Sequence, residues 1–153
     1  MWHPTHFQPE DPDPNVMMSA EPHHPPVDLA DAVGAADSAL GECLTLHIPG
    51  KDRNGTVIDQ APWIGEALAL LAQIGGRANI LPPVEGTWLN PDTGVLIQDS
   101  VVLAHTHVEP EHFEVSLGWL RGFLHRLGRE TNQAEVAFEF ADRLYKIRHF
   151  DHG

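Results

Sequence analysis

The sequence predicts an α+β domain with a ferredoxin-like, split β-α-β core and one extra strand at its C-terminal end. Two observations lead to this fold class. Segments whose apolar and polar residues alternate are interleaved with segments of helical period, in the order β-α-β-β-α-β-β. The first six elements of that order spell the split β-α-β arrangement. Right-handed crossovers then make the first strand antiparallel to the third and fourth strands beside it.

The first strand and the first helix have clear boundaries. Apolar and polar residues alternate over 43–48, which is typical of a half-buried strand, and Pro49-Gly50 ends it. Asp59 is expected to cap the following helix, whose first turn tolerates Pro62. Gly75-Gly76 is expected to end that helix.

A pair of strands follows. The first, 78–89, is interrupted by Pro82-Pro83, which confines that part of the chain to the edge of a sheet. Asn90 to Gly94 has the composition of a turn. The next strand, 95–107, is apolar on both faces in its middle, which is expected of a central strand.

The second helix opens at Glu109-Pro110, with proline near its first position. Its apolar residues follow at spacings of four, three, four and three, namely Phe113, Leu117, Leu120, Leu124 and Leu127. We expect the helix to end at Gly128. A strand over 135–140, a tight turn at Ala141-Asp142 and a last strand over 143–150 complete the domain.

Residues 1–42 differ in composition from the rest of the chain. They hold eight of the 22 acidic residues and no lysine or arginine, in a chain whose net charge is −13. Seven of the 13 prolines fall in residues 1–26, where the sparse apolar residues cannot offset the entropy of ordering. We therefore expect 1–42 to be a largely disordered arm, in which the alanine-rich stretch 27–40 can form a short helix. The folded domain is expected over 43–150.

The net negative charge argues against nucleic acid and anionic membranes as partners. Cys43 is the single cysteine, so no disulfide can form within the chain. The sequence contains neither an apolar run of the ~20 residues that span a bilayer nor a basic and then apolar start. We therefore expect a cytoplasmic protein.

The predicted topology sorts the loops between the two ends of the sheet. Three of them are expected at one end: 49–58, 89–94 and 128–133. His47 and Trp88 lie late in their strands and belong to the same end. We therefore expect most of a strand length to separate His47 from His105 and His107.

The end of the sheet that holds these loops is the predicted site. Candidate catalytic residues there are His47, Trp88, Arg129, Glu130 and Asn132. In this hypothesis His47 is a general base, Arg129 clamps an anionic group, and Glu130 or Asn132 orients the ligand. The alternative interpretation is that the polar residues of 128–133 satisfy carbonyl groups at the helix end.

Histidines near the other end of the sheet are a candidate metal site. His105 and His107 share one face of a strand, and Cys43 or His112 is expected close by. Such a pair lacks the second paired motif of a zinc site, so a polar strand end is the favoured interpretation. The sequence also lacks a phosphate-binding glycine loop, a dinucleotide fingerprint and a nucleophile elbow. We expect neither a metal nor a cofactor.

Six of the nine basic residues lie between 121 and 148, namely Arg121, Arg126, Arg129, Arg143, Lys146 and Arg148. They could form a basic patch for an anionic partner. Glu135 and Glu139 lie on the adjacent predicted strand, so cross-strand ion pairs are the simpler interpretation.

One stretch carries a family resemblance: Leu124-His-Arg-Leu-Gly-Arg-Glu-Thr-Asn-Gln-Ala-Glu-Val-Ala-Phe-Glu-Phe140, with Gly86-Thr87-Trp88 as a second marker. From Leu44 to about Phe150 the chain resembles small uncharacterised bacterial proteins with a ferredoxin-like core. The resemblance implies the fold and carries over no activity.

Two functions remain open. The first is a cytoplasmic binding or regulatory module, whose open sheet face contacts a second copy of the chain or another protein. The residues expected on that face are Cys43, Thr45, His47, Ala137 and Glu139. The second is a cofactor-free small-molecule enzyme that resembles dimeric α+β barrel proteins. In such proteins the sheet and helices enclose a pocket in which histidine, arginine or asparagine, and tryptophan position the substrate and transfer protons.

Overall fold

The computed structural model describes residues 27–36 and 41–152, in two units that span 1–38 and 39–153. The expected disorder of residues 1–26 lies outside the described residues, as do residues 37–40. In the first unit, the short helix α2 (Leu29–Val33) follows Asp28, whose carboxylate accepts a hydrogen bond from the amide of Asp31 at 3.1 Å. This contact satisfies one of the free amides of the first helical turn.

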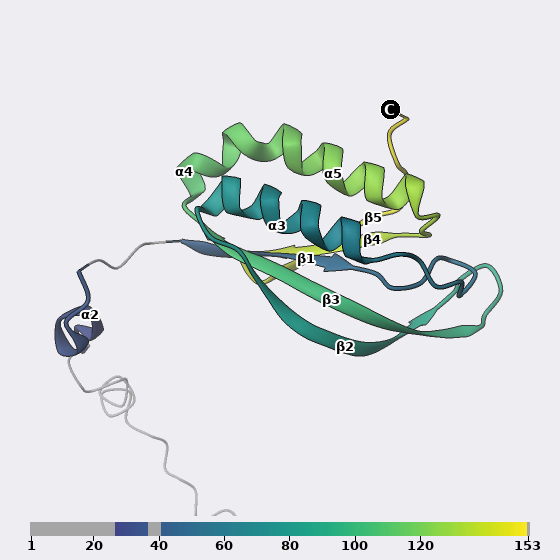
Figure 1. Ribbon diagram of the computed structural model, residues 1–153, viewed down its shortest axis with the longest axis horizontal. Helices are drawn as coiled ribbons and strands as arrows, with labels where there is room; N and C mark the ends of the chain where they lie inside the picture. Colours follow the sequence, from purple (N-terminus) through teal and green to yellow (C-terminus); the bar gives the residue numbers. More distant parts are fainter. Residues whose placement is uncertain (1–26, 37–40, 153) are drawn as a thin grey trace, which may run out of the picture. The chain divides into compact units, whose positions relative to one another are not determined.

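The described residues of the second unit form a five-stranded antiparallel sheet in the order β2-β3-β1-β4-β5 (Figure 1). The strands are β1 (Glu42–Ile48), β2 (Asn79–Leu89), β3 (Leu96–Val108), β4 (Val136–Phe140) and β5 (Arg143–Ile147). The first strand, β1, pairs antiparallel with both β3 and β4, as right-handed crossovers require. The predicted α+β fold class is confirmed, and the added C-terminal strand β5 lies at the edge of the sheet beside β4.

The longest helices of this unit in the described chain, α3 (Ala61–Gly75) and α5 (Leu117–Glu130), lie side by side on one face of the sheet (Figure 1). A short helix, α4 (Pro110–Phe113), and a 3₁₀ turn, η2 (Glu114–Ser116), lead into α5. Alternate side chains of β1 point toward the helices and form the centre of the core. They are Leu44, Leu46 and Ile48, all with no exposed surface. Each such burial contributes roughly 1.5–3 kcal/mol.

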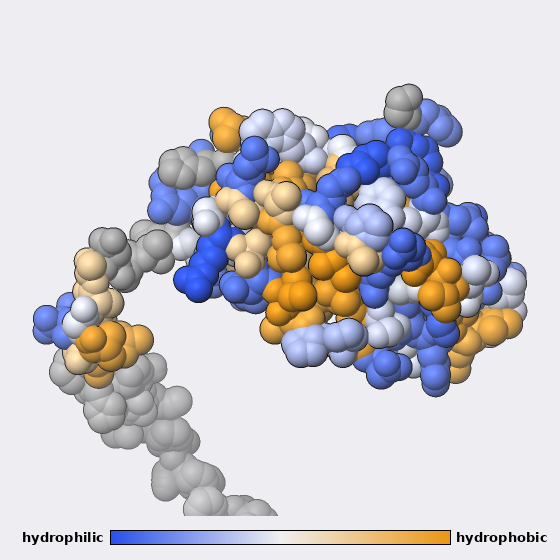
Figure 2. Space-filling view, viewed as in Figure 1, coloured by the Kyte–Doolittle hydropathy of each residue, from blue (hydrophilic) through white to orange (hydrophobic). Residues whose placement is uncertain are grey.

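The helices cover the sheet incompletely. The helix α3 packs on β3 and α5, while β2 lies beyond it at the edge of the sheet. Figure 2 shows apolar residues gathered where α3 lies over the β2–β3 side of the molecule, amid mainly hydrophilic surroundings. Ile80, on the helix side of β2, accordingly remains 48% exposed.

The start of α3 differs from the prediction. Gln60, rather than Asp59, occupies the capping position, and no side chain there bonds to the helix amides. The Gln60 side-chain amide donates instead to the carbonyl oxygens of Ile48 at 2.8 Å and Ser100 at 3.1 Å. The residue before the helix therefore ties β1 to β3. The predicted stop is correct, because Gly76 ends α3 with φ of 83°.

The end of α5 also differs from the prediction. The helix continues through Gly128 to Glu130. A Cβ atom at Gly128 would lie only 2.2 Å from the Phe150 ring, so this glycine admits an aromatic ring against the helix. The last strand is correspondingly shorter than 143–150. It ends at Ile147, and the chain then turns so that Phe150 packs on α5.

Candidate functional site

The sheet has one face packed against the helices and one face that no described element of its unit covers. We define the open face by the side chains that alternate with the buried ones. Its central members are Thr45 and His47 of β1, Asp99, Val101, Leu103 and His105 of β3, and Ala137 and Glu139 of β4. This face is the one that the sequence predicts to be open.

The three loops predicted at one end of the sheet meet there. The Arg53 amide donates to the Asn132 carbonyl oxygen at 3.0 Å, and the Asn90 side chain donates to the Arg53 carbonyl oxygen at 3.1 Å. The Gln133 side chain donates to the Lys51 carbonyl oxygen at 3.0 Å. These hydrogen bonds fix the loops against one another.

A cavity of about 180 Å³ lies beside these loops. It forms where β1 stops: Ile48 is the last residue paired with β3, whereas the β2–β3 hairpin continues beyond that point. Side chains from four strands line it, including His47, Trp88, Asp99, Val101 and Ala137, and Glu135 joins them from just before β4. The site therefore combines an aromatic and aliphatic wall with a few polar groups, as small-molecule sites generally do.

His47 is one of the ionisable groups that line the cavity. Its Nε2 atom lies 2.6 Å from Oε2 of Glu139. Glu139 belongs to the neighbouring strand β4, two residues away from the position opposite His47. An ionised carboxylate only accepts hydrogen bonds, so Nε2–H is the donor and Nδ1 is left as the basic nitrogen of a neutral ring. The side chains are 28% and 45% exposed, respectively. The pair can hold and transfer a proton at the rim of the cavity.

The wall formed by β3 is hydrogen-bonded to the loop that follows β1. Oδ1 of Asp99 accepts the Gly50 amide at 2.9 Å. A Cβ atom at Gly50 would lie 2.7 Å from the Ser100 carbonyl oxygen, so the backbone approaches β3 as closely as only glycine permits. Asp52 is similarly engaged, because its Oδ1 accepts the amides of Asn54 and Thr56.

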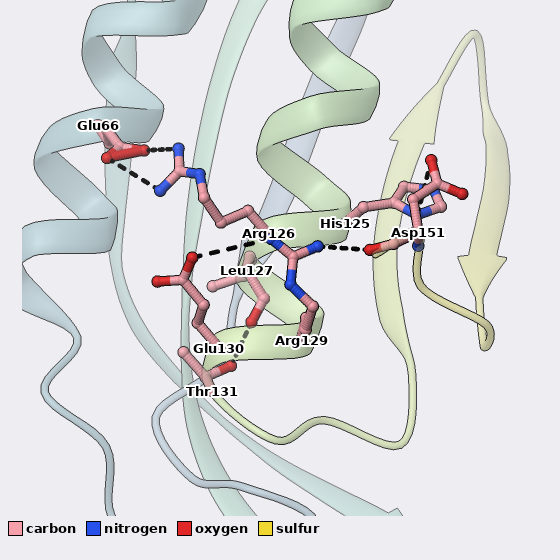
Figure 3. Close-up of polar contacts among 8 residues, drawn as sticks. All are labelled: Glu66, His125, Arg126, Leu127, Arg129, Glu130, Thr131 and Asp151. Carbon is pink, nitrogen blue, oxygen red and sulfur yellow. Dashed lines mark hydrogen bonds and ion pairs between the residues drawn. The ribbon is translucent and has the colours of Figure 1, made fainter. Parts of the chain in front are cut away.

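Two of the five sequence-predicted catalytic candidates line the cavity, and three do not. His47 and Trp88 are lining residues. Arg129 and Glu130 lie in the last turn of α5 and form a 3.9 Å ion pair, and Arg129 also donates to the carbonyl oxygen of Asp151 (Figure 3). The side chain of Asn132 is outside the cavity lining, and its backbone has φ of 52°.

The contacts of this helix end match the alternative interpretation of the polar stretch. The Thr131 hydroxyl donates to the Leu127 carbonyl oxygen at 2.6 Å (Figure 3). Gln133 then bonds both Thr131 and the loop that follows β1. These side chains satisfy backbone carbonyl groups at the end of α5.

Residues 148–152 are anchored on α5 through Asp151. Arg121 donates two hydrogen bonds to its carboxylate, at 2.7 and 2.9 Å. These bonds hold the pKa of Asp151 below its ordinary value and raise that of Arg121. The Asp151 amide also donates to Nδ1 of the buried His125 at 2.7 Å (Figure 3). This cluster lies outside the cavity and secures the chain after β5.

The candidate metal residues lie farther along the open face. Cys43 Sγ is 3.9 Å from Nδ1 of His105, and Cys43 is opposite His107 in the ladder. No three metal-binding side chains gather into a donor set among the residues that the structure describes. The expected separation from His47 is wrong for His105. It lies opposite Thr45, which makes it a diagonal neighbour of His47 on the same face.

Sequence reasoning missed Asp99 as a residue of the site, and the signal for it is the strand face that it shares with Val101. Sequence reasoning places Glu139 on the open face, but only the β1–β4 register brings it to His47. Within the described part of the chain, no helix is long and apolar enough to cross a membrane.

Comparison with known proteins identifies the fold. No family model and no curated protein matches the sequence. The structure is similar to a phage SAM lyase in complex with S-methyl-5'-thioadenosine, with a TM-score of 0.57 and 13% identity over 73% of this chain and 92% of that chain. A phage SAM lyase in the apo state gives a TM-score of 0.51 and 13% identity over 76% and 98%. At this identity the likeness establishes a shared α+β fold.

Proposed function

We propose that this chain binds a small organic molecule in the cavity at the end of β1, with a ring of the ligand against Trp88. The observation that carries the proposal is the cavity itself, where aromatic and aliphatic side chains of β2, β3 and β4 lie beside His47 and Asp99 in one lining. A volume of about 180 Å³ is comparable to the ~150 Å³ that holds a benzene ring. The cavity therefore takes one ring system, and the rest of the ligand extends along the open face.

The charges around the cavity narrow the ligand class. Asp52, Asp99 and Glu135 line it, against Lys51 as the one fully charged base among the described lining residues. Such a site favours a cationic or neutral ligand with hydroxyl groups over a phosphorylated one. A SAM lyase of similar fold acts on a sulfonium nucleoside and was solved with a neutral thionucleoside. S-adenosylmethionine and S-methyl-5'-thioadenosine are therefore the first ligands to test.

Isothermal titration calorimetry of the full chain tests this proposal, with ATP as the phosphorylated comparison. We expect a nucleoside without phosphate to bind and ATP to bind far more weakly. Trp88→Ala should weaken binding about tenfold or more, because one stacked ring contributes roughly 1–3 kcal/mol. The matched control is Trp119→Ala, since Trp119 is 57% exposed on α5 and does not line the cavity. Equal effects of the two substitutions, or tight ATP binding, would contradict the proposal.

The His47–Glu139 pair favours a second candidate, a cofactor-free enzyme that uses His47 as general base. In this reaction His47 takes a proton from the carbon next to the one bonded to the sulfonium sulfur of S-adenosylmethionine. The carbon–sulfur bond then breaks, and S-methyl-5'-thioadenosine and an unsaturated four-carbon amino acid are released. Chromatography of both products is the direct assay. His47→Gln should lower the reaction rate about 10²-fold or more. Glu139→Gln should also lower the rate, while ligand affinity changes little. Turnover by His47→Gln at the wild-type rate rules this candidate out and leaves the binding function standing.

The open face also supports the proposal that a protein binds there, either a second copy of the chain or another protein. Leu81, Val84 and Leu144 lie on this face and are 43%, 47% and 55% exposed. Light scattering at micromolar concentration tests the second copy. A dimer that Leu81→Glu dissociates is the expected result, and a monomer at every concentration excludes self-association.

A further inference from the structure

The two edges of the sheet differ in how they can pair with another strand. β2 forms one edge, and Pro82-Pro83 interrupts its ladder between Leu81 and Val84. Two prolines remove two amide donors, which blocks strand pairing at that place. β5 forms the other edge, and Arg143–Ile147 contains no proline.

The turn before β5 determines which of its backbone groups face outward. Ala141 and Asp142 have φ of 53° and 65°, which makes a two-residue turn of type I′. In such a hairpin the residues next to the turn, Phe140 and Arg143, exchange both of their backbone hydrogen bonds. Leu144 and Lys146 therefore direct their N–H and C=O groups away from β4. Among the described residues, neither forms a further backbone hydrogen bond.

The β5 edge is basic within an acidic chain. Arg143, Lys146 and Arg148 are all exposed, and the stretch 143–150 contains no acid, although the net charge is −13. Glu135, the residue just before β4, partly neutralises two of them, at 3.2 Å from Arg148 and 4.0 Å from Lys146. Pairing of β5 with β5 of another copy would bring together three cations from each chain, which is unfavourable. An acidic strand would instead be attracted.

A groove lies beside this edge on the helix side. It has a volume of about 610 Å³ between α5 and the β4–β5 hairpin. Its apolar lining includes Leu120, Phe138, Tyr145 and Ile147, and no acid is present among its described lining residues. A strand added to β5 would turn every second side chain toward this groove.

We propose that the β5 edge binds an acidic, extended segment of a partner protein by strand addition, with alternate apolar side chains of that segment in the α5–β5 groove. The outward amides and carbonyls of Leu144 and Lys146 supply the hydrogen bonds. The basic side chains select an acidic sequence, and the groove accepts the apolar residues. This surface is separate from the cavity at the end of β1, so the two proposals stand or fall independently.

Fluorescence anisotropy with labelled eight-residue peptides tests strand addition on the full chain. The probe alternates glutamate with valine. One comparison peptide alternates lysine with valine, and another is the acidic peptide with its alternate amides N-methylated. We expect the acidic probe to bind, with an affinity that falls as salt rises, and both comparison peptides to bind at least tenfold more weakly. Equal binding of the N-methylated peptide, or of the lysine peptide, overturns the proposal.

A pair of variants separates the backbone contact from charge. Lys146→Pro removes the outward amide and leaves the hydrogen bonds to β4 in place, so binding should fall at least tenfold. Lys146→Ala removes the same charge and keeps the amide, so binding should fall only a few-fold. Equal losses in the two variants count against strand addition. Melting curves establish that each variant folds, and if Lys146→Pro does not fold, the N-methylated peptide on the wild-type chain still decides.

Discussion

At the scale of single residues, Gly128 shows how one missing side chain positions a distant segment. It lies inside α5, where glycine normally lowers helix stability, yet an added Cβ would lie 2.2 Å from the Phe150 ring. The ring also packs edge-on against the buried His125, with centroids 6.1 Å apart. The cost of glycine in the helix is thus offset by aromatic packing on it.

Gly128→Ala is expected to destabilise the fold by about 1–3 kcal/mol, because the Phe150 ring must move. Urea denaturation measures the change. The control is Gly122→Ala in the same helix, where a Cβ meets no atom within 4 Å, and this variant should gain up to ~1 kcal/mol from helix propensity. In the Phe150→Ala background the penalty of Gly128→Ala should largely vanish. A penalty that persists there would show that Phe150 is not its cause.

At the scale of elements, the anchoring of residues 148–152 on α5 should depend on pH. The hydrogen bonds from Arg121 lower the pKa of Asp151 in the folded chain. The stabilisation is therefore complete above the pKa of Asp151 in the unfolded chain, which is about 3.9. It is lost as the pH falls through the lower pKa of Asp151 in the folded chain. Removal of the Asp151 carboxylate should lower the stability of the fold at neutral pH and leave it unchanged in acid.

Melting temperatures of the wild type and Asp151→Asn between pH 7 and pH 2 measure this dependence. The wild type should melt higher above pH ~5, and the difference should shrink toward zero as the pH falls through the lowered pKa of Asp151 in the folded chain. Asp59→Asn is the control, because no ion pair of the Asp59 carboxylate is present among the described contacts. A difference that stays constant down to pH 2 would assign the effect to something other than the charge of Asp151.

The sequence specifies the elements better than their ends. Alternation and helical spacing place every strand and both long helices of the folded unit, because these patterns record which face each residue buries. The predicted ends at Asp59, Gly128 and Phe150 differ from the observed ones. The observed ends depend on contacts between distant residues, such as Gln60 with Ser100 and Gly128 with Phe150. Local pattern carries no signal for those contacts.

The same limit applies to the site. Topology alone places His47 and Trp88 at one end of the sheet, and both line the cavity. The prediction that Gly128 ends the helix places Arg129 and Glu130 in a loop. With the helix extended to Glu130, their side chains meet each other and Asp151 instead. A single boundary error therefore moves two candidates away from the cavity.

At the scale of the whole molecule, the described core is self-sufficient within the second unit. All of its buried apolar residues lie between Leu44 and Val136, and the side chains packed around them extend to Phe150. A chain that starts at Gly41 should therefore melt within about 2 °C of the full chain. Differential scanning calorimetry of both forms makes the comparison. A loss of several degrees, about 1 kcal/mol or more, would show that residues 1–40 contribute to the fold.

The central position of β1 determines the order in which the fold can assemble during synthesis. Leu44 pairs with Thr106 on one side and with Phe140 on the other, so the first strand of the sheet receives both neighbours much later in the chain. While the ribosome makes the intervening segments, Leu44, Leu46 and Ile48 have no strand on either side. Closure of such long loops slows folding and leaves an apolar strand open to wrong partners. The nascent chain is thus most vulnerable to aggregation between the emergence of β1 and the arrival of β4.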